Sequence, residues 1–173
     1  MEFETDQIEL LHFKPEHQPF FESLNRVWIE EWFTMEEVDE WVLKNPEQAI
    51  LKNGGAIVMA TCNGEMAGTA GLRKIEDGKY EFTKMAVDQR FRRRGIARKI
   101  CLACCKIALE KNATEILLYS NTKNANAILM YENLGFEHLP VEKGVYERAN
   151  VKMRISIEKA KQCLATADPI TII

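Results

Sequence analysis

The chain has 173 residues, 46% of them hydrophobic and 28% charged, and a formal net charge of −3. This composition is ordinary for one soluble globular domain, and it excludes the overall basic field that draws proteins to nucleic acid or anionic membranes. The acidic start MEFETDQIEL does not resemble a secretory signal, and no run reaches the roughly 18 apolar residues that span a bilayer.

The first part of the chain predicts a strand followed by two helices. Residues 8–14 are short and rich in apolar side chains and stop before a proline, which is typical of a strand. Apolar residues recur at helical spacing over residues 16–31. A second helix is expected to start at Thr34, because its hydroxyl can cap free amides while Glu37 completes a capping box.

The middle of the chain predicts an antiparallel meander. Residues 56–62, 66–75 and 80–87 have strand character, and the turns between them carry the hairpin signals Asn-Gly and Asp-Gly. The second half predicts a helix over residues 95–111, a strand over 115–120, a helix over 124–134 and a strand over 150–157.

This element order mixes an antiparallel half with helical crossovers, so the fold class is α+β (mixed α/β). We expect one domain over residues 1–157. Residues 158–173 form a C-terminal tail whose Asp168-Pro169 argues against a continued helix and whose end, residues 170–173, could add a strand.

A basic turn between the strand at residues 80–87 and the next helix is the most informative segment. It contains Arg92, Arg93, Arg94, Gly95, Ile96, Ala97 and Arg98. The first amides of a helix lack partners and carry partial positive charge, and Gly95 lets backbone approach an anion closely. The turn therefore predicts a diphosphate site, although neither GxGxxG nor GxxxxGK[ST] is present. A solvated basic face or a nucleic-acid patch is the alternative.

Two segments resemble the GNAT superfamily of acyl-CoA-dependent N-acyltransferases. Residues 92–97 match its [QR]-x-x-G-x-[GA] signature, and residues 124–136 are similar to its N-x-x-A-[IV]-x-[LM]-Y-E-x-x-G-F segment. The resemblance implies a mostly antiparallel, twisted sheet of about six or seven strands, flanked by about four helices. It also implies that the sheet is splayed between strands 4 and 5.

The resemblance further implies acetyl-CoA as co-substrate, held in a V-shaped cleft at the splay. The pantetheine arm would pair with strand backbone, the amides from Arg93 to Arg98 would hold the pyrophosphate, and Asn124 would bond the arm where Ala127 leaves room. The residues expected to contact the cofactor are Met85, Ala86, Val87, Arg92, Arg93, Arg94, Gly95, Ile96, Ala97, Arg98, Asn124, Ala127 and Tyr131.

Acetyl transfer to an amine needs a neutral amine, a stabilised carbonyl oxygen and a protonated thiolate. The resemblance implies Tyr131 as the acid near the sulfur and the backbone amide of Met85 as the oxyanion donor. Glu81 is the candidate base. The alternatives are a core tyrosine at Tyr131 and a solvated carboxylate at Glu81, paired with Lys84 or Arg73.

The acceptor pocket is expected near Trp28, Glu31 and Trp32, because carboxylates beside aromatic rings suit a cationic amine. Buried tryptophans and a solvated acidic helix face are the alternative. A small-molecule primary amine is preferred as acceptor over a protein N-terminus or lysine. A catalytically silent acyl-CoA-binding module, or a nucleic-acid binder, would use the same basic turn differently.

The five cysteines predict a cytoplasmic protein with reduced thiols and no metal site. Their number is odd, and Cys101, Cys104 and Cys105 lie inside one predicted helix without a second pair of zinc ligands. We therefore expect them to pack in the core. By analogy with such folds, a homodimer is a further expectation, and neither nucleic acid nor membrane is an expected partner.

Overall fold

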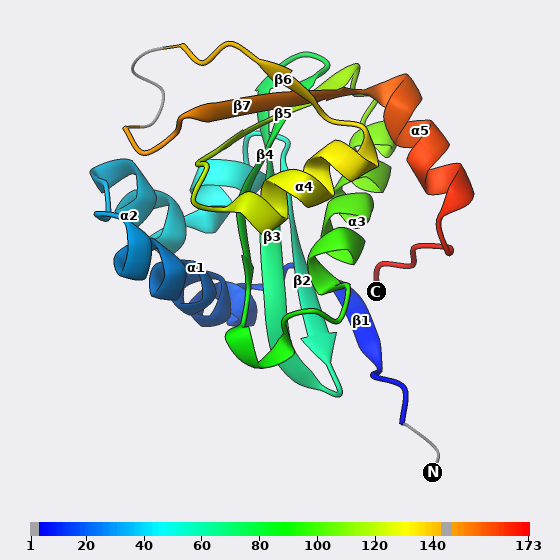
Figure 1. Cartoon of the computed structure of the whole chain (residues 1–173). Coiled ribbons are helices and arrows are strands. Elements are labelled where there is room, and N and C mark those ends of the chain that lie inside the picture. Colours follow the sequence, from blue (N-terminus) through cyan, green and yellow to red (C-terminus); the bar gives the residue numbers. More distant parts are fainter. Residues whose placement is uncertain (1–3, 143–146) are drawn as a thin grey trace.

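Seven strands form one sheet at the centre of the computed structural model, which describes residues 4–142 and 147–173 (Figure 1). The strands are β1 (Ile8–His12), β2 (Ala56–Cys62), β3 (Glu65–Glu76), β4 (Lys79–Val87), β5 (Glu115–Ser120), β6 (Glu137–Leu139) and β7 (Val151–Ser156). Their order across the sheet is β1-β2-β3-β4-β5-β7-β6, and β4 and β5 run parallel while all other neighbours run antiparallel. The predicted α+β class with a mostly antiparallel sheet is confirmed.

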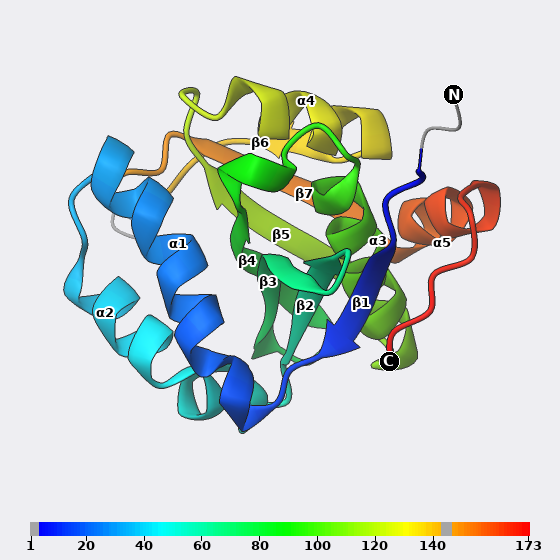
Figure 2. The same ribbon diagram turned by 90° about the horizontal axis from the view of Figure 1, so that it is seen from below.

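Helices cover both faces of this sheet. The α-helices are α1 (Gln18–Trp32), α2 (Glu37–Lys44), α3 (Ile96–Glu110), α4 (Ala125–Leu134) and α5 (Ile157–Thr166). Figure 2 shows α1 and α2 on one side of the sheet and α3 with α5 on the other. Two separate hydrophobic cores result, one around Phe21, Leu43 and Ile57 and a larger one that includes Phe82 and Ile100.

The predicted meander is present, and its turns have the expected chemistry. Asn63 and Gly64 both have positive φ, at 51° and 85°, which is the requirement of a type I′ hairpin turn. A close approach of α3 also depends on glycine, because a Cβ on Gly68 of β3 would lie 2.9 Å from Ile100 Cδ1.

A bulge and a splay interrupt the sheet at β4. The register moves from Thr69 opposite Ala86 to Gly71 opposite Thr83, so β4 carries one extra residue there, and Lys84 has a φ of 55°. On its other side β4 pairs with β5 only from Lys79 to Phe82. The remainder of β4 and the end of β5 therefore separate, as the resemblance implied for strands 4 and 5.

The second helix begins later than the sequence suggested. The prediction of a Thr34 cap is wrong, because α2 starts at Glu37 and its capping box joins Glu36 to Asp39. In that box the Asp39 carboxylate accepts from the Glu36 amide at 3.2 Å. An acidic side chain can replace a hydroxyl as the capping acceptor, so the Thr34–Glu37 spacing was a competing signal.

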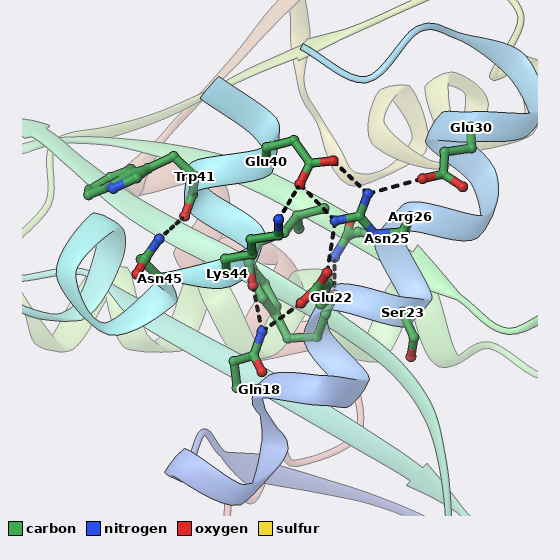
Figure 3. A network of polar contacts seen from close by, with 12 residues as sticks. Gln18, Glu22, Ser23, Asn25, Arg26, Glu30, Glu40, Trp41, Lys44 and Asn45 are labelled. Atoms are coloured by element: carbon green, nitrogen blue, oxygen red, sulfur yellow. Dashed lines mark hydrogen bonds and ion pairs between the residues drawn. The ribbon is translucent and has the colours of Figure 1, made fainter. Parts of the chain in front are cut away.

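An ion-pair network fixes α1 against α2 (Figure 3). Arg26 donates to both carboxylate oxygens of Glu40 on α2, at 2.7 and 2.9 Å, and to Glu22 and Glu30 on its own helix. The Arg26 guanidinium holds the pKa of Glu40 at about 2, below the ordinary value of 4.5. Bidentate geometry of this kind sets the relative orientation of two helices more firmly than a single bond would.

The end of the chain contains a helix that the sequence did not predict. Ser156 caps α5 by accepting from the Lys159 amide at 3.3 Å. After this helix, Ile172 forms a parallel bridge to Leu10, and the Ile173 amide bonds the Leu10 carbonyl at 2.8 Å. Residues 170–173 thus meet the edge of β1 in the same chain. The short strand β6 was also not predicted.

Candidate functional site

A cavity of about 1020 Å³ opens where β4 and β5 separate. This volume lies at the upper end of the roughly 300–1,000 Å³ of pockets for drug-sized ligands, so it is large enough for an extended ligand and a second molecule. Two ends can be distinguished. The cofactor end lies at the turn before α3 and at the start of α4. The acceptor end is lined by Trp28, Trp32, Phe33, Lys84, Lys123 and Arg148.

The turn before α3 has the backbone geometry of an anion site. Arg93 and Gly95 have positive φ values of 62° and 76°, and such alternation turns successive amides toward one side. The Lys99 amide bonds the Gly95 carbonyl at 3.1 Å and so begins the hydrogen-bond pattern of α3. The amides of Ile96, Ala97 and Arg98, in the first turn, are therefore available for an anion. A Cβ built on Gly95 meets nothing within 4 Å, so the space in front of the turn is open. A diphosphate fits these groups.

The arginines of the turn divide between two roles. Arg92, Arg93 and Arg98 line the cavity with Gly95, Ile96 and Ala97. The Arg94 guanidinium instead pairs with Asp6 at 3.0 Å and lies over the Phe91 ring. Among the described residues, the Arg94 side chain is therefore outside the cavity lining, and only its main chain can serve the predicted cofactor contact.

The residues predicted to contact pantetheine lie on both sides of the splay. Met85, Ala86 and Val87 line the cavity on the stretch of β4 that β5 no longer pairs. Opposite them, Asn124 and Ala127 line it from the start of α4. Asn124 is the N-cap residue of α4, but its side-chain amide makes no capping bond to the helix.

Tyr131 lies on α4 between the cavity and the core. It is 5% exposed and packs edge-on against Phe82 at 6.0 Å, with Phe136 at 5.6 Å. Burial, followed by the nearby thiols of Cys101 and Cys104, raises its pKa well above the ordinary value of 10. The hydroxyl consequently stays protonated as a donor, which both the core and the catalytic interpretations allow.

Glu81 lines the cavity but is not solvated. It is 1% exposed, and its Oε1 accepts from Arg73 Nη2 at 2.6 Å across the β3–β4 ladder. One of the two partners considered from the sequence, Arg73, is thus present. The residue lines the cavity while its carboxylate is bonded to Arg73, so its role as base stays a prediction.

The acceptor end brings together residues from four separate parts of the chain. Trp28 and Trp32 line it as predicted, whereas Glu31 is exposed and lies outside the lining among the described residues. Phe33 packs edge-on to Trp28 at 6.1 Å, and Lys123 Nζ lies 5.0 Å from the Phe33 ring centre. Neither Lys123 nor Arg148 was expected at this site from the sequence.

A buried carboxylate organises the cations at this end. Asp39 is 0% exposed and accepts from Lys84 Nζ at 2.7 Å and from Arg148 at 2.5 and 2.8 Å. Arg148 also donates to Glu36 at 2.8 Å. Burial alone would raise the pKa of Asp39, but Arg148 and Lys84 outweigh it and lower the pKa to about 2. The sequence signal for this cluster was weak, a lysine (Lys84) within a predicted strand that also contains Glu81 and Thr83.

The cysteines pack as predicted in α3. Cys101, Cys104 and Cys105 are buried, and burial raises the pKa of Cys104 above its usual value. No group of three or more metal-binding side chains occurs in residues 4–142 and 147–173. None of the helices in the described chain has the length and apolar character to cross a bilayer.

Known proteins share both the sequence pattern and this fold. The chain is 28% identical over 106 residues to the N-acetylaspartate synthetase of Rattus norvegicus, covering 61% of this chain, and it spans about 33% of that relative's length. A GNAT-family acetyltransferase structure from Staphylococcus aureus Mu50 matches 87% of this chain and 99% of its own, at 21% identity and a TM-score of 0.78.

A second similar structure is a spermidine N-acetyltransferase from Vibrio cholerae in complex with CoA and spermine. It matches 90% of this chain and 98% of its own, at 21% identity and a TM-score of 0.67. The model of the acetyltransferase (GNAT) family, an enzyme class whose co-substrate is acetyl-CoA, matches residues 14–136. The chain therefore belongs to the GNAT family of acetyltransferases.

Proposed function

We propose that the protein transfers an acetyl group from acetyl-CoA to the primary amine of a small molecule, in a ternary complex. The single observation that carries this proposal is the continuous cavity that joins the open turn at Gly95 to the splay beside Met85 and to the acceptor end. A direct transfer needs both substrates in one cavity, with the thioester at the junction.

The chain's own groups suit the steps of this reaction. Amides from Arg93 to Arg98 would bind the diphosphate, and the Met85 amide would stabilise the charge that grows on the carbonyl oxygen. The amine nitrogen attacks the thioester carbon, the C–N bond forms and the C–S bond breaks. Tyr131 would protonate the departing thiolate, and Glu81 would take the amine's proton, directly or through water.

Two alternatives use the same cavity differently. A catalytically silent module would bind acyl-CoA without turnover, and an enzyme for protein N-termini or lysines would need a peptide to reach the acceptor end. The names of the similar proteins refer to aspartate and to spermidine, which carry net charges of opposite sign. We propose a cytoplasmic location, because all five cysteines are free and four are buried. A homodimer also stays a proposal.

Calorimetry with coenzyme A, followed by a free-thiol assay with acetyl-CoA and pooled small amines, tests the proposal. Saturable binding together with amine-dependent thiol release is expected. Binding without release from any amine in a broad pool, peptides included, would leave the silent module as the better description. No heat with folded protein would overturn the cofactor site itself.

Mutation of Glu81 tests the proposed base separately. Glu81→Gln should lower kcat at neutral pH by about 100-fold, in the range of general base catalysis, without changing the affinity for coenzyme A. Arg73→Gln is the matched control, because it removes the ion pair and keeps the carboxylate. Equal losses in the two variants would mean that the pair is structural.

A further inference from the structure

The charged side chains that line the acceptor end are cations. Lys84, Lys123 and Arg148 line it, whereas Glu81, bonded to Arg73, is the single carboxylate in the lining formed by the described residues. This differs from the expectation of carboxylates that would hold a cationic amine. The acidic residues of α1 and α2 that suggested it are either exposed, like Glu31, or bonded to cations, like Glu36 and Asp39.

The carboxylates bonded to two of these cations lie outside the lining. Asp39 is fully buried and bonds both Lys84 and Arg148, and Glu36 bonds Arg148 as well. These two carboxylates balance the charge of Lys84 and Arg148 and fix both side chains in position. Lys123, over the Phe33 ring, adds one further positive charge at the same end.

We infer that the amine acceptor carries a carboxylate group, as an amino acid does. This inference rests on the proposed function. A carboxylate accepts charge-assisted bonds from guanidinium and ammonium groups, so it suits a lining whose charged groups are Lys84, Lys123 and Arg148. A polyamine would instead bring positive charge against Lys84, Lys123 and Arg148.

The same cations would also assist the chemistry. A positive charge near an amine favours its neutral form, which is the form that attacks the thioester. The carboxylate of the substrate would face the cations while the amine faces the junction near Glu81 and Met85. Binding and activation of the acceptor would then depend on one set of side chains.

Matched pairs of substrates test the inference. The rates of acetyl-CoA-dependent acetylation are measured for L-leucine and L-alanine, for their carboxamides, which carry no carboxylate, and for spermidine. We expect kcat/KM to be at least about tenfold higher for each acid than for its amide, because the amide loses charge-assisted bonds. Amidation lowers the pKa of the amine, so reactivity alone would favour the amide.

Two variants show whether the named residues carry the preference. Lys123→Met and Arg148→Gln should each lower the acid-to-amide ratio by about tenfold and leave the affinity for coenzyme A unchanged. Lys161→Met is the matched control, because Lys161 is an exposed lysine of α5 outside the lining. It should keep the wild-type ratio.

The outcomes separate this inference from the proposed function. Amides or spermidine acetylated as well as the acids would overturn the inference and leave the enzyme assignment in place. An unchanged ratio in both variants would also overturn it. Failure of every amine, with coenzyme A still bound, would overturn the proposed function first.

Discussion

The two ends of the cavity are built on different principles. At the cofactor end the proposed contacts are main-chain amides of consecutive residues around Gly95, where the chain passes from a turn into α3. The acceptor end uses side chains of α1, β4 and the segment before β7, held by Asp39 from α2. Backbone geometry binds what all substrates share, while side chains select one substrate. The two ends should therefore respond to mutation independently, and the following experiments test that separation.

The largest effect is expected at the junction of the two ends. Tyr131→Phe removes the hydroxyl that would protonate the thiolate and keeps the ring against Phe82 and Phe136. We expect kcat to fall by about 1,000-fold, within the range for general acid catalysis, while the affinity for coenzyme A changes little. Single-turnover kinetics and calorimetry measure the two quantities. Unchanged kcat would assign Tyr131 to the core alone.

The next effect concerns the buried carboxylate of the acceptor end. Asp39→Asn leaves the buried Lys84 and the half-buried Arg148 without their shared carboxylate, so the free energy of unfolding should fall by about 3 kcal/mol. Urea unfolding measures this change. Glu40→Gln is the control on the same helix, because its carboxylate pairs with Arg26 nearer the surface and should matter much less.

Asp39 also predicts how stability depends on pH. Its pKa is about 2 in the folded protein and 3.8 ordinarily, so the unfolded state binds the proton more readily. The stabilisation from this group is complete above about pH 4 and is lost as the pH falls through 2, and it amounts to about 2 kcal/mol. Asp39→Asn should flatten the acid limb of the unfolding profile. If the acid limb of the Asp39→Asn variant matched that of the wild type, the Asp39 ion pairs with Lys84 and Arg148 would not form in solution.

A smaller effect is expected at the cofactor end. Gly95→Ala places a Cβ in the open space in front of the turn at a φ of 76°, so the Kd for coenzyme A should rise by about tenfold. Gly64→Ala is a matched control, since Gly64 has a φ of 85° and an equally open Cβ position in the β2–β3 turn. The two variants carry similar backbone strain. Equal Kd values would argue against a main-chain site at Gly95.

The contrast between the ends also explains how much could be predicted from the sequence. The turn at Gly95 and the residues of α4 are contiguous motifs, so their spacing pointed to the proposed cofactor end. Likewise, β2 to β4 follow from strand-forming runs separated by turn residues. The cations of the acceptor end were missed because Lys84 and Arg148 meet at Asp39 across separations of 45 and 109 residues. No local pattern reports such a contact.

Two elements were missed for a different reason. In α5 the apolar residues Ile157, Ala160 and Cys163 recur at helical spacing behind Ser156, which is a usable signal. Pro169 argued against a continued helix, but this proline lies beyond the end of α5. The strand β6 has three residues, and its pairing with β7 is tertiary. So short a segment has no periodicity to detect.

The smallest expected effect tests whether the acceptor end depends on residues that never touch a ligand. Arg26→Met removes the bidentate link between α1 and α2 shown in Figure 3 and keeps the aliphatic stem. Trp28 lies on α1 and Asp39 on α2, so a small shift between these helices should weaken acceptor binding. We expect the KM for the acceptor to rise about threefold, which corresponds to the free energy of one partly exposed ion pair. The Kd for coenzyme A should not change, since α3 and α4 are untouched. The effect should shrink in high salt, which screens the wild-type link as well. A change in coenzyme A affinity equal to the change in KM would instead mean that the two ends are coupled through the sheet.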